Sequence, residues 1–171
     1  MRSLLKLSIL SLSFLLLVLS CSESGNETTD NSNNQDSYLF SEISTKSFTY
    51  YSGTPIITAA RGNSPHGFIR IKFDSIAFSV LDAGQNLPNG KSFPNGSLIV
   101  KEVYSTINDS LTFYAVMKKN PSSSVSGNGY EWAEFRSNGK TYFSTGKKGV
   151  GCISCHAGGS NRDLVRTFDL H

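Results

Sequence analysis

The chain has few side chains that bind metals, and its charge is nearly balanced. Three cysteines and three histidines occur in 171 residues, with no second C-x-x-C. A structural zinc site needs four nitrogen or sulfur ligands, so this scarcity argues against one. Without Arg2 and Lys6, 14 basic and 13 acidic side chains remain. No basic cluster marks a nucleic-acid-binding face, so no nucleic-acid partner is expected.

The longest apolar run, residues 7–19, is too short to span a bilayer as a helix. It follows Arg2 and Lys6 and ends in Val18-Leu19-Ser20-Cys21. A basic start, a short apolar core and a small residue at the cleavage site are typical of an export signal. The last four residues resemble the lipobox of bacterial lipoproteins, in which the cysteine is acylated and becomes the new N-terminus. An ordinary signal peptide with an incidental cysteine is the alternative.

Residues 22–37 contain no apolar side chain. Such a segment cannot bury enough surface to offset the entropy of ordering, so we expect a disordered tether. The sequence therefore predicts a lipoprotein signal peptide at 1–20, a lipidated Cys21 with a polar tether at 21–37, and one domain at 38–171. We expect export to the periplasmic side or the cell surface. Acyl chains would anchor the protein to the membrane, without a transmembrane helix in the mature chain.

The other two cysteines lie in Gly151-Cys152-Ile153-Ser154-Cys155-His156, a C-x-x-C-H motif. Two sulfurs three positions apart lie on one face of a helical turn, where both can reach the vinyl groups of one porphyrin. His156 would then be the proximal iron ligand. A thioredoxin-like redox pair is the alternative, but that pair starts a helix in a βαβ unit, whereas this motif follows a β-rich region. The motif predicts one covalently bound haem c.

Residue patterns before the motif predict a β-rich α+β domain. Two early extended segments are expected at residues 47–51 and 67–72. Two hairpins with polar turns are expected, one from 97–104 with 111–118 and one from 130–136 with 140–144. Apolar residues at helical spacing predict one amphipathic helix capped by Asp74, formed by Phe73, Ile76, Ala77, Val80 and Leu81. We therefore expect a mainly antiparallel sheet with short helices, followed by the haem motif.

The segment Phe93-Pro94-Asn95-Gly96-Ser97-Leu98-Ile99-Val100-Lys101-Glu102 resembles the F-x-x-G-T/S-x-x-V-K-E segment of the cytochrome P-460 family. An aromatic strand around Trp132 and Phe135, the C-x-x-C-H motif and Asp163-Leu164-Val165 follow in the same order, so the resemblance covers residues 65–168. It implies a five-coordinate c-type haem, a lysine bonded to the porphyrin edge, and oxidation of hydroxylamine at the iron. That lysine would be Lys101. The related cytochrome c-prime-beta shares the fold, lacks the lysine bond and binds nitric oxide.

The local pattern also singles out Lys101. Side chains alternate along a strand, so Ile99, Lys101 and Val103 share one face. Apolar neighbours would desolvate the amine, lower its pKa and make it nucleophilic. A lysine on the solvent face of a two-sided strand is the alternative. If the bond forms, Lys101 is both a cofactor-binding and a catalytic residue.

Three further observations bear on function. Oxidation of hydroxylamine releases protons, and a base near the iron would help. The segment that contributes to the distal pocket in the family, here residues 140–151, has no Asp or Glu. This absence weakens the expectation of turnover and leaves ligand binding intact. Met117 and His66 could each be a sixth iron ligand, but we expect Met117 to pack in the core and His66 to lie on the polar surface of a turn.

Three functions remain open from the sequence. The first is an enzyme that oxidises hydroxylamine at a lysine-bonded haem, and the second is a protein that binds nitric oxide or another diatomic ligand. The third is an electron carrier with Met117 or His66 as the sixth ligand. A redox partner protein and a membrane are expected partners, and a homodimer is also considered.

Overall fold

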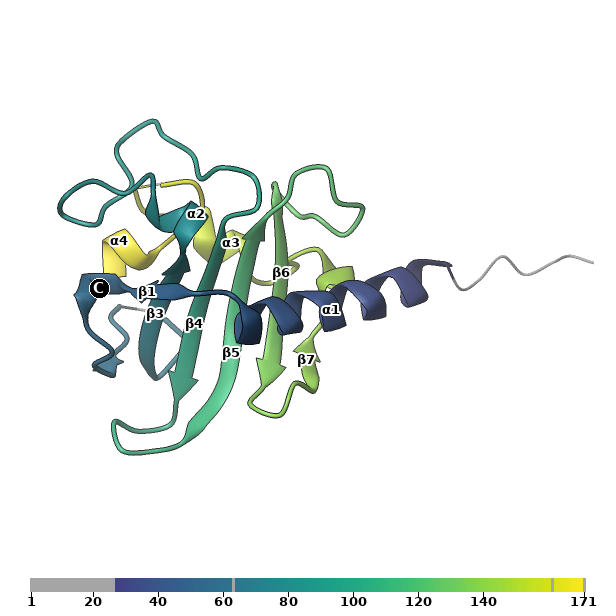
Figure 1. Cartoon of the computed structure of the whole chain (residues 1–171), viewed down its shortest axis with the longest axis horizontal. Coiled ribbons are helices and arrows are strands. Elements are labelled where there is room, and N and C mark those ends of the chain that lie inside the picture. The colour runs from purple at the N-terminus through teal and green to yellow at the C-terminus, as the bar shows by residue number, and fades with distance from the viewer. Residues whose placement is uncertain (1–26, 63, 161, 171) are drawn as a thin grey trace, which may run out of the picture.

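The computed structural model describes residues 27–62, 64–160 and 162–170. One antiparallel sheet of seven strands lies at its centre, as the β-rich α+β prediction required. Figure 1 shows a long helix crossing one face of this sheet, while the short helices and the C-terminal segment cover the other face. The two apolar cores lie on these two faces.

The strand order is β1-β3-β4-β5-β6-β7, and β2 also pairs with β3. Both predicted hairpins are confirmed, namely β4 with β5 and β6 with β7. The strand bounds are β1 Phe48–Tyr50, β2 Thr58–Ala59, β3 Phe68–Asp74, β4 Leu98–Tyr104, β5 Leu111–Lys119, β6 Tyr130–Arg136 and β7 Thr141–Phe143.

The helices are mostly single turns. Their bounds are α1 Glu27–Thr45, η1 Tyr51–Gly53, α2 Ser75–Phe78, η2 Thr145–Lys147, α3 Ile153–His156 and α4 Thr167–Leu170. The helix predicted from Phe73 to Leu81 is reduced to α2, because Phe73 and Asp74 complete β3. Asp74 is the N-cap, as expected: its carboxylate accepts a hydrogen bond from the backbone N–H of Ala77 at 2.9 Å.

The prediction of a disordered tether is wrong for residues 27–37, which form the first half of α1. Polar contacts to η2 and to the sheet replace the apolar burial that the segment lacks. The Asp36 carboxylate accepts hydrogen bonds from the backbone N–H and the hydroxyl of Thr145, at 2.9 and 2.7 Å. The Gln35 side chain donates to Glu131 at 2.7 Å. The folded unit therefore includes α1, whose first residue precedes the expected domain start at 38.

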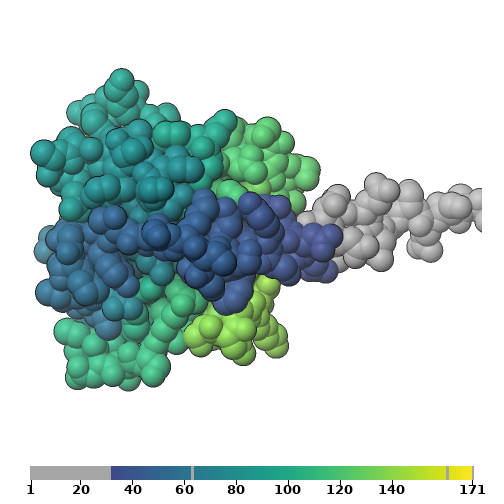
Figure 2. All heavy atoms as spheres, in the orientation of Figure 1, coloured from purple at the N-terminus to yellow at the C-terminus, as the bar shows by residue number. Residues whose placement is uncertain are grey.

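Residues 1–26 lie outside the described residues, and with them the expected export signal, Cys21 and the start of the tether. In the described part of the chain, no helix is long and apolar enough to cross a membrane. Figure 2 shows α1 and the segment after it as a continuous band across one face of the molecule.

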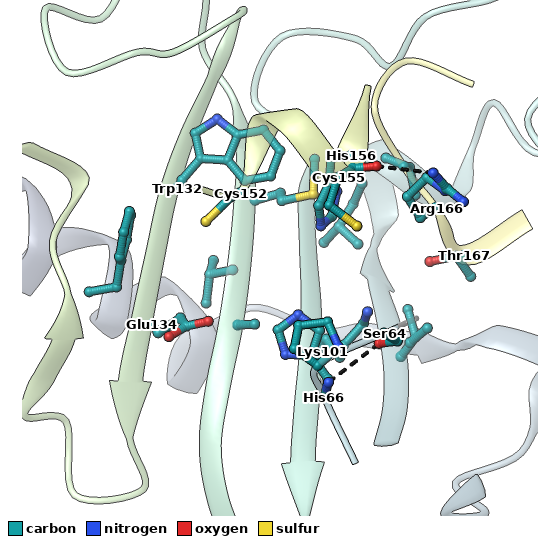
Figure 3. Close-up of a pocket in the computed structure, with 18 of the residues that line it drawn as sticks. Ser64, His66, Lys101, Trp132, Glu134, Cys152, Cys155, His156, Arg166 and Thr167 are labelled. Atoms are coloured by element: carbon teal, nitrogen blue, oxygen red, sulfur yellow. Dashed lines mark hydrogen bonds between the residues drawn. The ribbon is translucent and has the colours of Figure 1, made fainter. Parts of the chain in front are cut away.

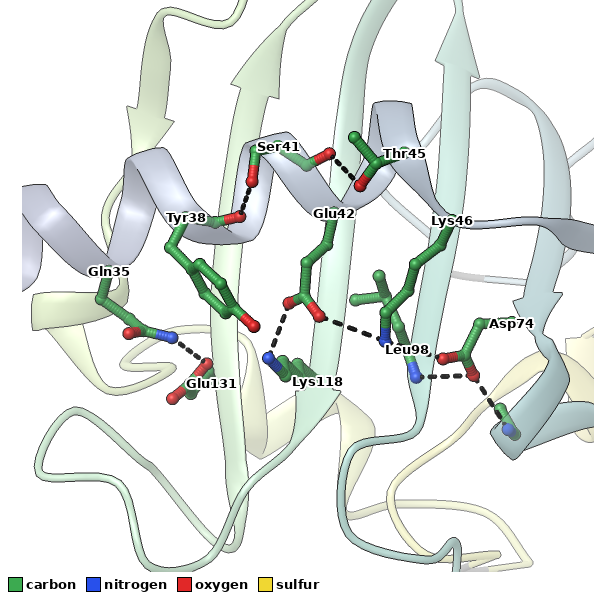
Figure 4. Close-up of polar contacts among 11 residues, drawn as sticks. Gln35, Tyr38, Ser41, Glu42, Thr45, Lys46, Asp74, Leu98, Lys118 and Glu131 are labelled. Carbon is green, nitrogen blue, oxygen red and sulfur yellow. Dashed lines mark hydrogen bonds and ion pairs between the residues drawn. The ribbon is translucent and has the colours of Figure 1, made fainter.

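Ion pairs hold the second half of α1 on the sheet. Glu42 lies between Lys118 at 2.6 Å and Lys46 at 3.1 Å, and Lys46 also pairs with Asp74 at 3.1 Å (Figure 4). Apolar packing of Leu39 and Ile43 fills the space between these charges. Since a buried charge is costly without its partner, this network fixes the position of α1 on the sheet.

Asp36→Ala should lower the free energy of unfolding by about 3 kcal/mol, because it leaves two buried donors of Thr145 without acceptors. Asp109→Ala, a change in an exposed turn, should stay within about 0.5 kcal/mol of the wild type. Urea unfolding of the three proteins, followed by circular dichroism, measures the difference. Equal stability of the two variants would contradict the role given to Asp36.

Candidate haem site

The face of the sheet opposite α1 borders a cavity of about 240 Å³. Its lining is mainly apolar, with a small number of polar side chains, as is typical of a cofactor site. The C-x-x-C-H motif covers the side of the cavity that faces away from the sheet, and both cysteines and His156 line the cavity (Figure 3). Strands β4, β5 and β6 form the opposite wall.

Cross-strand pairing arranges the side chains on this face in rows. The first row is Ile99, Met117 and Trp132; the second is Ile71, Lys101, Ala115 and Glu134; the third is Val103, Phe113 and Arg136. Successive rows are about 7 Å apart, because two residues of a strand separate them. The rows describe the position of a cavity group along the strand direction of β4, β5 and β6.

His156 lies level with the first row. Its imidazole packs edge-on against the Trp132 ring, with ring centroids 5.0 Å apart. Its Nδ1 is 2.8 Å from the carbonyl oxygen of Leu164. A carbonyl only accepts hydrogen bonds, so Nδ1 carries the proton and Nε2 keeps a free lone pair. Burial lowers the pKa of His156 to about 4, so the ring is neutral at physiological pH, as an iron ligand must be.

The two cysteines are thiols, one half-buried and one exposed. The single turn of α3 places them on one side of the chain, as the spacing predicted. Two thiols, a neutral imidazole and an apolar slot fit a c-type haem. Among the described residues, no group of three or more His, Cys, Asp or Glu could hold a bare metal ion.

Lys101 enters the cavity from the second row (Figure 3). Its strand neighbours Ile99 and Val103 are buried in the apolar core on the same face, as the alternation predicted. Burial lowers the pKa of Lys101 to about 8, while the nearby thiol of Cys155 acts in the opposite direction. Within the described ranges its amine has no hydrogen bond or ion pair. It is therefore a desolvated amine next to the haem-attachment motif.

Residues 49–167 match the family model described as Cytochrome P460. The chain belongs to the cytochrome P460 family. No curated protein matches it. Family membership implies a c-type haem cofactor, which would supply an iron centre that binds small ligands and exchanges electrons. Cys152, Cys155 and His156 are the residues that would hold it in this cytochrome P460.

The two other candidate iron ligands lie at different heights in this cytochrome P460. Met117 is buried in the first row between Ile99 and Trp132, which agrees with the expected packing role. His66 is half-buried and lines the cavity, so the expected surface position is wrong. Its ring centroid is 6.1 Å from that of Phe113, in the third row. Met117 is thus level with His156, whereas His66 lies near Phe113 of the third row.

Glu134 is a cavity residue that the sequence analysis missed. It projects from the second row of β6 into the cavity (Figure 3). Residues 140–151, the segment expected to supply an acid, do lack Asp and Glu. Alternation along β6 was the available signal, because Glu134 shares a face with Trp132. Burial raises the pKa of Glu134 above its usual range.

The double variant Cys152→Ser/Cys155→Ser should lose all covalently bound haem, since a serine hydroxyl forms no thioether with a vinyl group. Haem staining after denaturing electrophoresis, in a host competent for cytochrome c maturation, measures this loss. Ser154→Ala, which keeps the motif spacing, should stain like the wild type. A colourless, zinc-loaded wild-type protein would refute the haem assignment.

Proposed function

We propose that this chain is an exported, lipid-anchored cytochrome P460 that oxidises hydroxylamine at one five-coordinate haem c bonded to Lys101. The supporting observation is the desolvated, unpaired amine of Lys101 in the cavity that the C-x-x-C-H motif covers. Electrons would leave to a redox partner protein, and protons would leave to cavity groups and solvent.

The state of the Lys101 amine supports the bond to the porphyrin. A carbon–nitrogen bond requires the neutral amine, because the ammonium form has no free lone pair. With a pKa of about 8, a sizeable fraction of Lys101 is neutral at physiological pH, whereas an exposed lysine is almost wholly charged. The amine also faces Cys155, one of the two residues that would hold the porphyrin.

The heights of Met117 and His66 support an open iron position. Met117 packs beside Trp132, whose ring contacts His156, so Met117 is level with the proposed proximal ligand. His66 lies near Phe113 of the third row, with ring centroids 6.1 Å apart. The second row contains Ala115, whose small side chain leaves room for a small ligand. This arrangement favours a ligand-binding haem over an electron carrier with two protein ligands.

The second candidate function is a binding protein for nitric oxide or another diatomic ligand, without turnover. One observation favours it: the segment 140–151 supplies no carboxylate to the cavity. Both candidates use the same haem and the same open position. The bond to Lys101 is the feature that separates them.

Lys101→Arg should abolish the bond, because a guanidinium keeps the charge but lacks the nucleophilic amine. The variant should bind haem, show an ordinary c-type spectrum, lose hydroxylamine oxidation and still bind nitric oxide. Mass spectrometry of the proteolysed wild type should find the Lys101 peptide joined to the Cys152–Cys155 peptide through one porphyrin. Lys118→Arg, on the opposite face of the sheet, is the matched control. Free separation of the two peptides would identify the protein as the ligand-binding relative.

Export and lipid anchoring rest on residues 2–21 of the sequence. Cys21→Ala should leave the domain folded and remove the acylation site. Metabolic labelling with a radioactive fatty acid should therefore mark the wild type alone. Label retained in the variant would show that Cys21 is not the acylated residue.

A further inference from the structure

The ordered helix α1 brings the proposed lipid anchor close to the folded domain. Residues 22–26 separate Cys21 from Glu27, the first residue of α1. A chain extends by at most about 3.5 Å per residue, so Cys21 and Glu27 are no more than roughly 20 Å apart. A disordered tether over residues 22–37 would have reached more than twice as far. Acyl chains on Cys21 therefore hold the domain against the membrane, and one part of its surface faces the bilayer.

The first half of α1 lies beside η2, at the β7 edge of the sheet. Asp36 accepts both hydrogen bonds from Thr145 at the start of η2. A Cβ atom on Gly146 would lie 2.9 Å from the Cβ atom of Ser32. Ser32 is about 7.5 Å along the helix from Glu27, the end that leads to the anchor. Figure 1 shows β7 and this end of α1 at the same edge of the sheet. The anchor therefore brings η2 and β7 to the bilayer.

The exposed charged side chains of the segment that contains β5, β6, β7, η2 and the haem motif are all basic. In residues 111–168 the acids are Glu131, Glu134 and Asp163, and each of them is buried or half-buried. The exposed charged side chains of this range are those of Arg136, Lys140, Lys147 and Lys148. A surface with this charge attracts anionic groups over about one Debye length, about 8 Å at physiological ionic strength.

Lys147, Lys148 and Val150 form the part of this surface next to the haem motif, here called the η2 surface. Within the described ranges neither lysine forms an ion pair, and Lys147 lies over the Phe143 ring at 5.3 Å. Lys148 has a left-handed backbone with φ of 49° and ends η2. Val150 is 75% exposed. Lysines that bind lipid phosphates, beside an apolar side chain that enters the bilayer interface, are typical of membrane-binding surfaces.

We propose that the η2 surface binds the anionic phospholipid headgroups of the membrane that carries the anchor. The two ammonium groups contact headgroup phosphates, and Val150 enters the boundary between headgroups and acyl chains. Cys152 follows Val150 by two residues, so this contact holds the haem-attachment motif close to the bilayer. The orientation rests on the lipid anchor of the proposed function, whereas the charge-dependent contact does not require acylation.

Energy transfer from a fluorescent lipid headgroup to the haem measures this contact in the acylated holoprotein. The protein is added to vesicles of phosphatidylcholine alone, or of phosphatidylcholine with phosphatidylglycerol, each with a trace of the fluorescent lipid. Quenching per bound haem should be stronger on the anionic vesicles at about 0.01 M salt. It should fall to the neutral-vesicle value at about 1 M salt, where the Debye length is about 3 Å. Equal quenching on both vesicles at low salt would overturn the proposal.

Lys147→Gln/Lys148→Gln should lower the equilibrium constant for docking on anionic vesicles about 25-fold, because each lysine near the surface contributes about fivefold. Arg61→Gln/Lys91→Gln removes the same charge from exposed sites and is the matched control. Arg61 follows β2, which pairs with β3 near the other edge of the sheet, so this variant should dock like the wild type. Both variants should keep the visible spectrum of the wild type, which shows an intact haem site. Wild-type docking by the lysine variant would overturn the proposal.

Flotation of the same vesicles separates this proposal from acylation of Cys21. Acylated protein floats with phosphatidylcholine vesicles at any salt concentration, and its absence from them would refute the anchor. Salt-sensitive binding of that protein to anionic vesicles would still support the η2 surface. The lysine variant could instead dock like the wild type and pass electrons more slowly to a redox protein. That result would assign the η2 surface to an acidic redox partner and overturn the membrane contact.

Discussion

Alternation of side chains along β4, β5 and β6 places two different environments on the two faces of one sheet. On the α1 face, each buried acid forms an ion pair or accepts hydrogen bonds from amide, hydroxyl or backbone donors. On the cavity face, the second row holds one amine and one carboxylate that have no partner among the described residues. Because unpaired buried charges are costly, groups retained in this state are candidates for interaction with a cofactor or substrate.

The position of the haem motif depends on contacts made from both faces. On one side, Asp36 of α1 holds Thr145 at the start of η2, four residues before Gly149. On the other side, Gly149 passes directly over the Trp132 ring, where a Cβ atom would collide with the indole. The same ring packs against His156, and its Nε1 donates to the Gly127 carbonyl at 2.9 Å. The N-terminal helix and a buried tryptophan thus position the motif together.

Local patterns in the sequence predicted the sheet and the motif, because period-two alternation and the C-x-x-C-H spacing are local properties. Helix α1 could not be predicted this way, since its polar first half is ordered by partners far along the chain, such as Thr145 and Glu131. The helix after Phe73 was overestimated because its apolar spacing also fits a strand end followed by one capped turn. For Glu134, alternation along β6 predicts which face of the sheet the side chain occupies. It does not predict the cavity, which forms only where β6 and the C-x-x-C-H motif come together in the fold.

The spacing of Lys101 and Glu134 has a consequence for the charge inside the cavity. In the haem-free chain the amine and the carboxylate are separated by Ala115, too far apart for a direct ion pair. A bond between Lys101 and the porphyrin would convert a cation into a weakly basic, neutral amine. Glu134 would then be the only formal protein charge left in the second row. The charge balance of the cavity would then depend on the iron, on this carboxylate, and on His66 and Arg166, which also line the cavity.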